Sequence, residues 1–231
     1  RELEFLVGLA RQATVALHNA RLFDETRQAL EQQQASAEVL AAISNSIADT
    51  APVFETILTS CERLFEGRLI GVNLVGDDGM IRIGAYHGPG RGELEKIFPA
   101  KLDGTTGSGA AILARSVLHF PDIERGEGVP PGTVQGSRAI GVRAIVFAPM
   151  LWEGRGIGAI FVGREHPVPF TDKEIGLLKT FADQAVIAIQ NARLFNETKE
   201  ALDQQQAAAA VLGVIGRSVA DALPVFEVIR D

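Results

Sequence analysis

The sequence predicts an α+β fold in which an antiparallel sheet is flanked by long N- and C-terminal helices. Two regions, 69–85 and 143–164, alternate apolar and polar residues as β-hairpins do. Residues 3–48, in contrast, contain no Pro and only one Gly, Gly8, and are rich in Ala, Leu, Glu and Gln, which favours a long helix. Part of this helical stretch recurs near the C-terminus, so the chain contains an internal repeat.

The repeat has an offset of 172 residues, as the pair Asn19 and Asn191 shows. Residues 18–34 match 190–206, and the motif Pro-Val-Phe-Glu at 52–55 returns at 224–227. A unit of this length suits one globular domain plus a connector. We therefore expect a helical linker at 1–50, a domain at 51–194, and a second linker with the start of a further domain at 195–231. On this interpretation the chain begins in the last helix of one domain and stops in the first helix of another.

Both linker helices carry a narrow apolar seam with the alternating three- and four-residue spacing of a coiled coil. Polar residues such as Thr26 and Gln33 dilute it. So narrow a seam needs a partner helix, and we expect a homodimer through the terminal helices. The alternative is an unpaired helix that serves as a spacer. The seam consists of Phe23, Leu30, Ala37, Leu40 and Ile47, repeated as Phe195, Leu202, Ala209, Leu212 and Val219.

The domain is expected to open with a helix that starts near Pro52 and buries a stripe from Val53 to Phe65. A hairpin follows, with strands at 69–75 and 81–85 around the turn Asp77-Asp78-Gly79. A short helix within 91–98, a helix at 110–115 and a strand at 117–120 complete this half of the domain.

Residues 121–138 are predicted to form a long loop, because four glycines and the pair Pro130-Pro131 interrupt any periodicity. Loops of such length inside a domain are usually functional. A second hairpin at 143–152 and 157–164 leads to the final helix. Thr171 and Glu174 form a capping box for that helix.

Four segments of the second half resemble the GAF domain family. They are Pro149-Met-Leu151, Gly156-Ile-Gly-Ala-Ile-Phe-Val162, Pro169-Phe-Thr-Asp-Lys-Glu174 and the run from Phe181 to Phe195. The linkers resemble those that join tandem GAF domains in bacterial sensor histidine kinases and nucleotide cyclases. The resemblance implies a GAF-like antiparallel sheet of five or six strands with helices packed on it, often dimeric through its terminal helices. Family members bind cyclic nucleotides, bilins, haem or other small molecules, or bind nothing.

The resemblance places a ligand pocket between the sheet and the segment from about His87 to Arg143. Arg138 and Arg143 flank the predicted loop, and a guanidinium in such a place can pair with a carboxylate or a phosphate. The alternative is that both are surface arginines beside a loop. The polar candidates in this window are His87, Thr105, Thr106, Ser108, Asp122, Ser137, Arg138 and Arg143.

Composition and motif counts exclude several function classes. A net charge of −7 with scattered Lys and Arg argues against nucleic-acid binding, and the most apolar run, 139–152, is too short to span a membrane. The only cysteine, Cys61, lies on an apolar helix stripe, so neither a covalent bilin nor a two-cysteine redox site is expected. The lone histidines do not predict a haem site, and metal-ligand spacing and a catalytic constellation are both missing.

These observations predict a non-catalytic, cytoplasmic sensory or relay module of a multidomain signal-transduction protein. Its expected partners are a second copy of itself and the neighbouring GAF and output domains. The alternative is a ligand-free structural spacer and dimerisation module. The identity of any ligand and the type of output domain do not follow from the residues.

Overall fold

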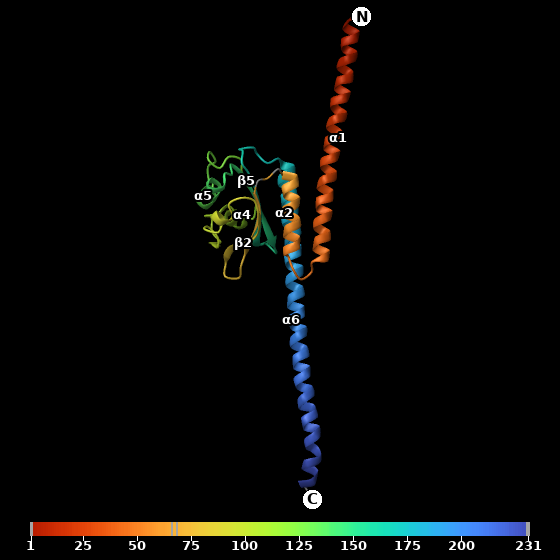
Figure 1. The fold of residues 1–231 in the computed structure, drawn as a ribbon, viewed down its shortest axis with the longest axis vertical. Helices are drawn as coiled ribbons and strands as arrows, with labels where there is room; N and C mark the ends of the chain where they lie inside the picture. Colours follow the sequence, from red (N-terminus) through yellow and green to blue (C-terminus); the bar gives the residue numbers. More distant parts are fainter. Residues whose placement is uncertain (1, 66, 68, 230–231) are drawn as a thin grey trace.

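The computed structural model describes residues 2–65, 67 and 69–229, with side chains described for 11–65, 67, 69–209 and 212. The chain folds into one sheet with helices on both faces and two long projecting helices (Figure 1), which confirms the predicted α+β class. The elements are α1 (Glu2–Asn45), α2 (Ala51–Phe65), β1 (Leu69–Val75), β2 (Met80–His87), α3 (Arg91–Leu94), β3 (Ala100–Lys101), α4 (Gly107–Ala114), β4 (Leu118–Phe120), α5 (Pro131–Ile140), β5 (Ala144–Trp152), β6 (Arg155–Arg164) and α6 (Asp172–Ile229).

The sheet is antiparallel, with the strand order β3-β2-β1-β6-β5-β4. The β5–β6 hairpin turns on Glu153 and Gly154, which both have positive φ, as a tight two-residue turn requires. The β1–β2 pairing shifts register between Val72 and Asn73. Such irregularities re-aim a side chain, and Asn73 proves to face the candidate site.

One face of the sheet is covered by α2 and α6, which lie between the strands and α1 (Figure 1). Alternate residues of each strand point to this face, as a half-buried pleat dictates. On β5, for example, Val146 and Met150 join the helix-face core while Phe147 points to the opposite side. The helix face therefore carries the larger of the apolar clusters, and it includes Phe181 of α6 and Phe65 of α2.

The second half of α1 also belongs to this core. Ala35, Val39 and Ile43 are buried and pack against α2 and α6. The spacing of four residues places the three on one stripe of the helix. The linker helix is thus part of the domain's own packing, and the boundary expected at residue 50 does not separate it from the core.

The predicted seam lies on a different face of the linker helices and is exposed to solvent in this single chain. Leu40 is 50% exposed and its equivalent Leu212 is 68% exposed. The other described seam residues, Phe23, Leu30, Ala37, Ile47, Phe195, Leu202 and Ala209, are also exposed. Val219 lies outside the described side chains. Pairing with a second chain remains a prediction.

The start of α6 follows the sequence prediction. The Thr171 amide donates to Glu174 Oε2 at 2.7 Å and the Glu174 amide donates to Thr171 Oγ1 at 3.3 Å, which together form the capping box. Arg164, at the end of β6, donates to the Phe65 carbonyl at the end of α2 and also pairs with Glu174. These bonds join the ends of α2 and β6 to the first turn of α6.

Two expectations for the middle of the domain were wrong, and one strand was missed. The second half of the predicted loop 121–138 is helix α5, in which Pro131 occupies the first turn and Gly141 ends the helix with a φ of 74°. Helix α4 begins at Gly107 instead of residue 110, and the short edge strand β3 was not predicted. Both α4 and α5 contain two glycines. Glycine disfavours a helix in the sequence pattern, so helices that tertiary contacts stabilise were not predicted here.

Candidate functional site

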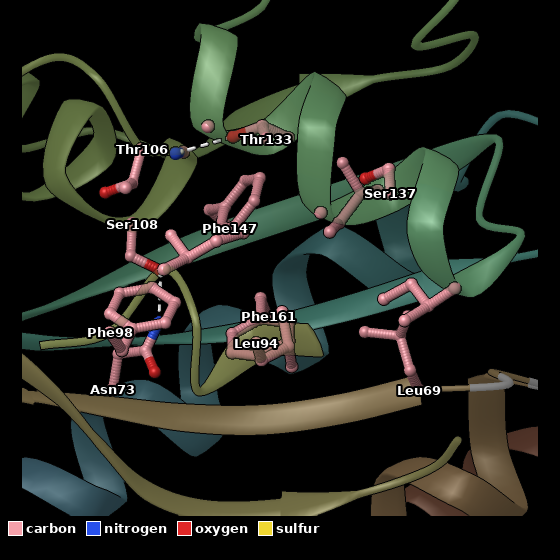
Figure 2. Close-up of a pocket in the computed structure, with 16 residues that line it drawn as sticks. Leu69, Asn73, Leu94, Phe98, Thr106, Ser108, Thr133, Ser137, Phe147 and Phe161 are labelled. Carbon is pink, nitrogen blue, oxygen red and sulfur yellow. Dashed lines mark hydrogen bonds between the residues drawn. The ribbon is translucent and has the colours of Figure 1, made fainter. Parts of the chain in front are cut away.

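A pocket lies between the sheet and the segments α3, α4 and α5, on the face opposite α2 and α6 (Figure 2). Phe147, Phe161 and Asn73 form its floor, and helix residues close it from above. Its cavity volume is about 40 Å³, enough for about three or four water molecules at roughly 10–15 Å³ each. The lining consists of Leu69, Asn73, Leu94, Ile97, Phe98, Thr106, Gly107, Ser108, Gly132, Thr133, Gly136, Ser137, Ile140, Ile145, Phe147 and Phe161.

Two glycines make room for the aromatic floor. A Cβ on Gly71 of β1 would lie 2.4 Å from the Phe161 ring, and a Cβ on Gly107 of α4 would lie 2.3 Å from the Phe147 ring. Such distances are too short for any larger side chain. The first turn of α4 can therefore approach the sheet only because residue 107 is glycine.

Hydroxyl groups connect the pieces of the lining. The Thr133 Oγ1 of α5 accepts from the Gly107 amide at 2.7 Å (Figure 2). Thr106 caps α4 by accepting from the Gly109 amide. These bonds occupy two of the free amides at the N-terminus of α4. Within the glycine-rich stretch 104–109, the Gly107 amide thus holds α4 to α5, and the Gly109 amide holds the N-cap of α4 itself.

Asn73 is the most unusual residue of the pocket. Its side chain is 1% exposed, and its Nδ2 donates to Ser108 Oγ at 2.8 Å (Figure 2). Its Oδ1 has no hydrogen-bond partner. An unpartnered buried carbonyl oxygen costs about 1–3 kcal/mol, so the pocket contains one unused acceptor in an otherwise apolar strand.

The structure brings three of the predicted site residues together. Thr106, Ser108 and Ser137 are all buried and line the pocket, as Figure 2 shows. They come from the start of α4 and from α5. Their hydroxyls are polar but uncharged, and none of the residues that line the pocket is Lys, Arg, His, Asp or Glu.

The other predicted residues lie outside the pocket lining. His87 points to α2, where its ring nitrogens lie 2.8 Å from Glu55 and 3.1 Å from Glu62. Thr105 bonds to the Asp103 carboxylate, and Arg138 is exposed on α5.

Arg143 pairs with Asp122 beside the pocket, although its buried Nε has no hydrogen-bond partner. The guanidinium donates to Asp122 Oδ1 at 2.9 Å and lies 3.2 Å from Glu124. This hydrogen bond lowers the pKa of Asp122 below its usual value. The guanidinium of Arg143, which was expected to face a ligand, therefore pairs with Asp122 and Glu124 of the preceding segment.

A second set of contacts joins the pocket side of the domain to α6. Strand β4, which follows α4, holds His119, whose Nε2 accepts from the Phe170 amide at 3.1 Å and whose ring lies edge-on to the Phe170 ring. Phe170 directly precedes the capping residue Thr171, and the Arg164 guanidinium lies 4.0 Å above its ring. Burial, together with the charge of Arg164, lowers the pKa of His119.

The described residues offer little for redox or metal chemistry. Cys61 is fully buried on α2, and burial raises the pKa of its thiol. Within the described part of the chain, His, Cys, Asp and Glu side chains do not gather into any group of three that could hold a metal ion. None of the helices searched there is long and apolar enough to cross a membrane.

Sequence reasoning missed Asn73, Thr133 and the two phenylalanines of the floor. The available signal was Asn73 itself, a polar residue in the apolar strand Leu-Ile-Gly-Val-Asn-Leu-Val. Thr133 was assigned to a loop, and Phe147 and Phe161 look like ordinary core residues in their hairpin.

The comparisons agree with this fold. The GAF domain family model matches residues 49–189, more than half of the chain, so the chain belongs to the GAF domain family. A search among curated protein sequences finds no match.

Solved structures share the fold at low sequence identity. A domain of a two-component sensor histidine kinase protein from Sinorhizobium meliloti 1021 is 20% identical, with a TM-score of 0.54 over 64% of this chain and 94% of that one. Free methionine-R-sulfoxide reductase from Neisseria meningitidis is 15% identical, with a TM-score of 0.61 over 73% and 93%. A GAF domain/HD domain protein from Geobacter sulfurreducens is 18% identical, with a TM-score of 0.54 over 66% and 98%.

Proposed function

We propose that this GAF domain is a cytoplasmic relay module of a multidomain signalling protein, such as a two-component histidine kinase or a nucleotide cyclase. In this proposal, repacking around the pocket changes the position of α6 and so acts on the next domain. GAF domains occur in signalling proteins, among them the histidine kinase and HD domain proteins whose structures are similar. The following contacts within this chain connect the pocket to α6.

The observation that carries the proposal is the continuity of α6. The helix is capped at Thr171, buries Leu178 and Phe181 in the helix-face core, and leaves the domain as part of the connector without interruption. From Asp172 to Arg217 alone it spans about 70 Å at 1.5 Å per residue. A helix of this kind moves as a rigid element, so a displacement at the sheet reaches its far end.

The contacts at His119 give the pocket access to this helix. Ser108 of α4 bonds to Asn73 in the pocket floor, α4 leads into β4, and His119 of β4 accepts from the Phe170 amide at the start of α6. A ligand that donates to Asn73 Oδ1 would reorient this amide, weaken the bond from Nδ2 to Ser108 Oγ and so shift α4. The shift would then reach α6 through an edge strand three residues long.

The lining chemistry limits what the pocket would sense. A nucleotide phosphate needs cationic partners, and the described lining has none. The cavity is also far below the roughly 300–1,000 Å³ of drug-sized ligand sites. A small uncharged ligand that donates a hydrogen bond to Asn73 Oδ1 fits the site as it stands.

The second candidate function is a ligand-free spacer, and the small volume of the cavity favours it. A spacer would use the same helices without any coupling to the pocket. An enzyme is the weakest candidate, since the buried Cys61 is the only thiol in the chain and a thiol redox cycle needs a second, resolving thiol.

Insertions in the linker distinguish relay from spacer. One residue added after Gln205 rotates everything downstream by about 100°, whereas seven added residues nearly preserve the helical face. In a protein that carries an output domain after α6, the relay predicts a large change of output with one residue and a small change with seven. Equal output from both insertions would establish a spacer.

We further propose that two chains pair through the exposed seam. Leu30 and Leu40 on α1, with Leu202 and Leu212 on α6, would otherwise leave apolar stripes in water. Sedimentation of the chain at tens of micromolar should show a dimer, and charged residues at Leu40 and Leu212 should convert it to a folded monomer. Sedimentation as a monomer without any substitution would refute the pairing.

A further inference from the structure

Three apolar residues with which α1 packs on this domain are repeated in α6. Ala35, Val39 and Ile43 recur without change as Ala207, Val211 and Ile215, at the repeat offset of 172 residues. The first three are 0%, 0% and 6% exposed because they pack against α2 and α6. Ala207, in contrast, is exposed on the projecting part of α6.

The sequence around these residues is also repeated. Asp49, whose carboxylate accepts from the Ala51 amide at 2.9 Å in the turn between α1 and α2, recurs as Asp221. Pro52, in the first turn of α2, recurs as Pro224. The α2 residues that enter the core first, Val53, Phe54 and Ile57, recur as Val225, Phe226 and Ile229. Residues 207–229 therefore carry the sequence signals of the helix, turn and helix at 35–57.

At the N-terminal half of α1 the relation is reversed: residues that are buried in α6 have exposed equivalents in α1. Ala185, Ala188 and Ala192 of α6 are buried in this domain's core. Their equivalents Ala13, Ala16 and Ala20 are all exposed on α1. The N-terminal half of α1 thus leaves these packing residues uncovered, and α6 leaves Ala207 uncovered, the member of its set whose side chain is described.

We propose that Ala207, Val211 and Ile215 form a docking stripe for a second GAF domain of this type that follows in the same polypeptide. The helices of that domain equivalent to α2 and α6 would cover the stripe, as α2 and α6 cover Ala35, Val39 and Ile43 here. Helix α6 would then end and turn back between Arg217 and Ala222, as α1 does after Asn45.

The proposed turn also explains why residue 224 is a proline. Helix α6 runs through this residue in the present structure, although an interior proline lacks the amide donor and its ring collides with the carbonyl four residues earlier. In the docked form Pro224 would lie in the first turn of a new helix, where no donor is needed. The seam residue Leu212 would stay exposed, as Leu40 does, so docking and pairing use separate faces.

This interaction surface goes beyond the relay function and holds whether or not the pocket binds a ligand. It predicts that each long helix between two domains is packed at both ends. Its first half packs on the preceding domain and its second half on the following domain. A duplicated chain tests it directly. Residues 1–222 followed by residues 51–231 preserve the offset and supply the second domain from this chain's own sequence.

The test compares two adjacent substitutions, Val211→Asp in the stripe and Leu212→Asp in the seam, by hydrogen exchange and mass spectrometry of the duplicated chain. A charge in the stripe would lose its hydration on docking, so Val211→Asp should speed exchange in the second domain's α2 by more than about tenfold. Exchange in the first domain's α2 should not change. Leu212→Asp should leave both domains unchanged.

A milder substitution keeps the test informative if Val211→Asp prevents the second domain from folding. Val211→Ala removes two methyl groups without adding charge, and it should speed exchange in the same helix by a smaller factor. Unfolding of the second domain alone by Val211→Asp, but not by Leu212→Asp, supports the proposal. An unchanged second domain in both Val211 variants, or equal effects of Val211→Asp and Leu212→Asp, would overturn it.

Discussion

The two faces of the central sheet are built differently. The pocket face buries five polar side chains, those of Asn73, Thr106, Ser108, Thr133 and Ser137, around a cavity of about 40 Å³. The helix face, covered by α1, α2 and α6, has a large apolar cluster, and its helices bury two polar side chains, Ser60 and Gln184.

Because of this difference, the helix face should be rigid and the pocket face should be able to rearrange. Close apolar packing resists displacement and transmits strain, which is what a helix face coupled to α6 requires. Hydroxyl and amide contacts around a small cavity can exchange partners at little cost, because each bond contributes only about 1 kcal/mol net. The pocket face is therefore the side on which a ligand can act.

The largest expected effect is on the helix face. Phe181→Ala removes a ring that is completely buried in the α6 packing, and it should lower the free energy of unfolding by about 3–5 kcal/mol. Ile187→Ala on the same helix is the control, because Ile187 is 47% exposed and its truncation should cost well under about 1 kcal/mol. Chemical denaturation of both variants measures the difference, and equal losses would contradict the cohesive role of this face.

The junction between the faces should respond to pH through His119. Its pKa is lowered in the folded state, mainly by burial. The unfolded chain therefore takes up this proton first as the pH falls below about 6.5, and folding stability falls with it. Above that pH both states are neutral at this residue and its contribution is complete.

His119→Gln should remove part of this slope between pH 7 and pH 5, while keeping an acceptor for the Phe170 amide. Thermal unfolding across this range, compared with His166→Gln on an exposed loop, isolates the effect. A slope that persists unchanged in His119→Gln would show that the junction does not titrate.

The smallest expected effect is on the pocket face. Asn73→Leu removes the unpartnered Oδ1 but also the Nδ2 that donates to the buried Ser108 hydroxyl. The gain and the loss offset in part, so it should lower the free energy of unfolding by no more than about 1–2 kcal/mol. Asn73→Asp is the matched control, and a buried unpaired carboxylate should instead destabilise the domain clearly. A loss above about 3 kcal/mol in Asn73→Leu would mean that this amide is essential to the fold and is not reserved for a ligand.

Local signals made some elements predictable. The cap of α6 needs only Thr171 and Glu174, three residues apart, and the β5–β6 turn needs only its glycine. Helix α5 could not be predicted in this way. Its Gly132 is required because a Cβ there would lie 2.8 Å from the Thr105 carbonyl, a contact that depends on the tertiary fold.

The same distinction explains the candidate site. Ser108 and Ser137 were placed near the pocket by the family resemblance, whereas Arg143 was expected to face it and instead pairs with Asp122, 21 residues earlier in the chain. Such a pairing leaves no local mark in the sequence. The burial of Val39 on α1 was also missed, because Val39 lies beside the seam residue Leu40 and both fit a helical apolar pattern.

The coupling of the two faces can be measured with spin labels on the helices. Ala41→Cys on α1 and Glu200→Cys on α6 replace exposed residues, and the buried native Cys61 is not available to a thiol-directed label. Diluting labelled with unlabelled protein confines the measured distance to one chain. Ser137→Leu then fills the pocket in place of a ligand, and Ala139→Leu on the exposed side of α5 is its control.

The relay predicts that Ser137→Leu shifts the distance between the two labels by about 1–2 Å, the size of helix movements in switching proteins, whereas Ala139→Leu leaves the distance unchanged. If the distance stays the same in both variants while Ser137→Leu remains folded, the pocket does not act on α6, and the domain is a spacer.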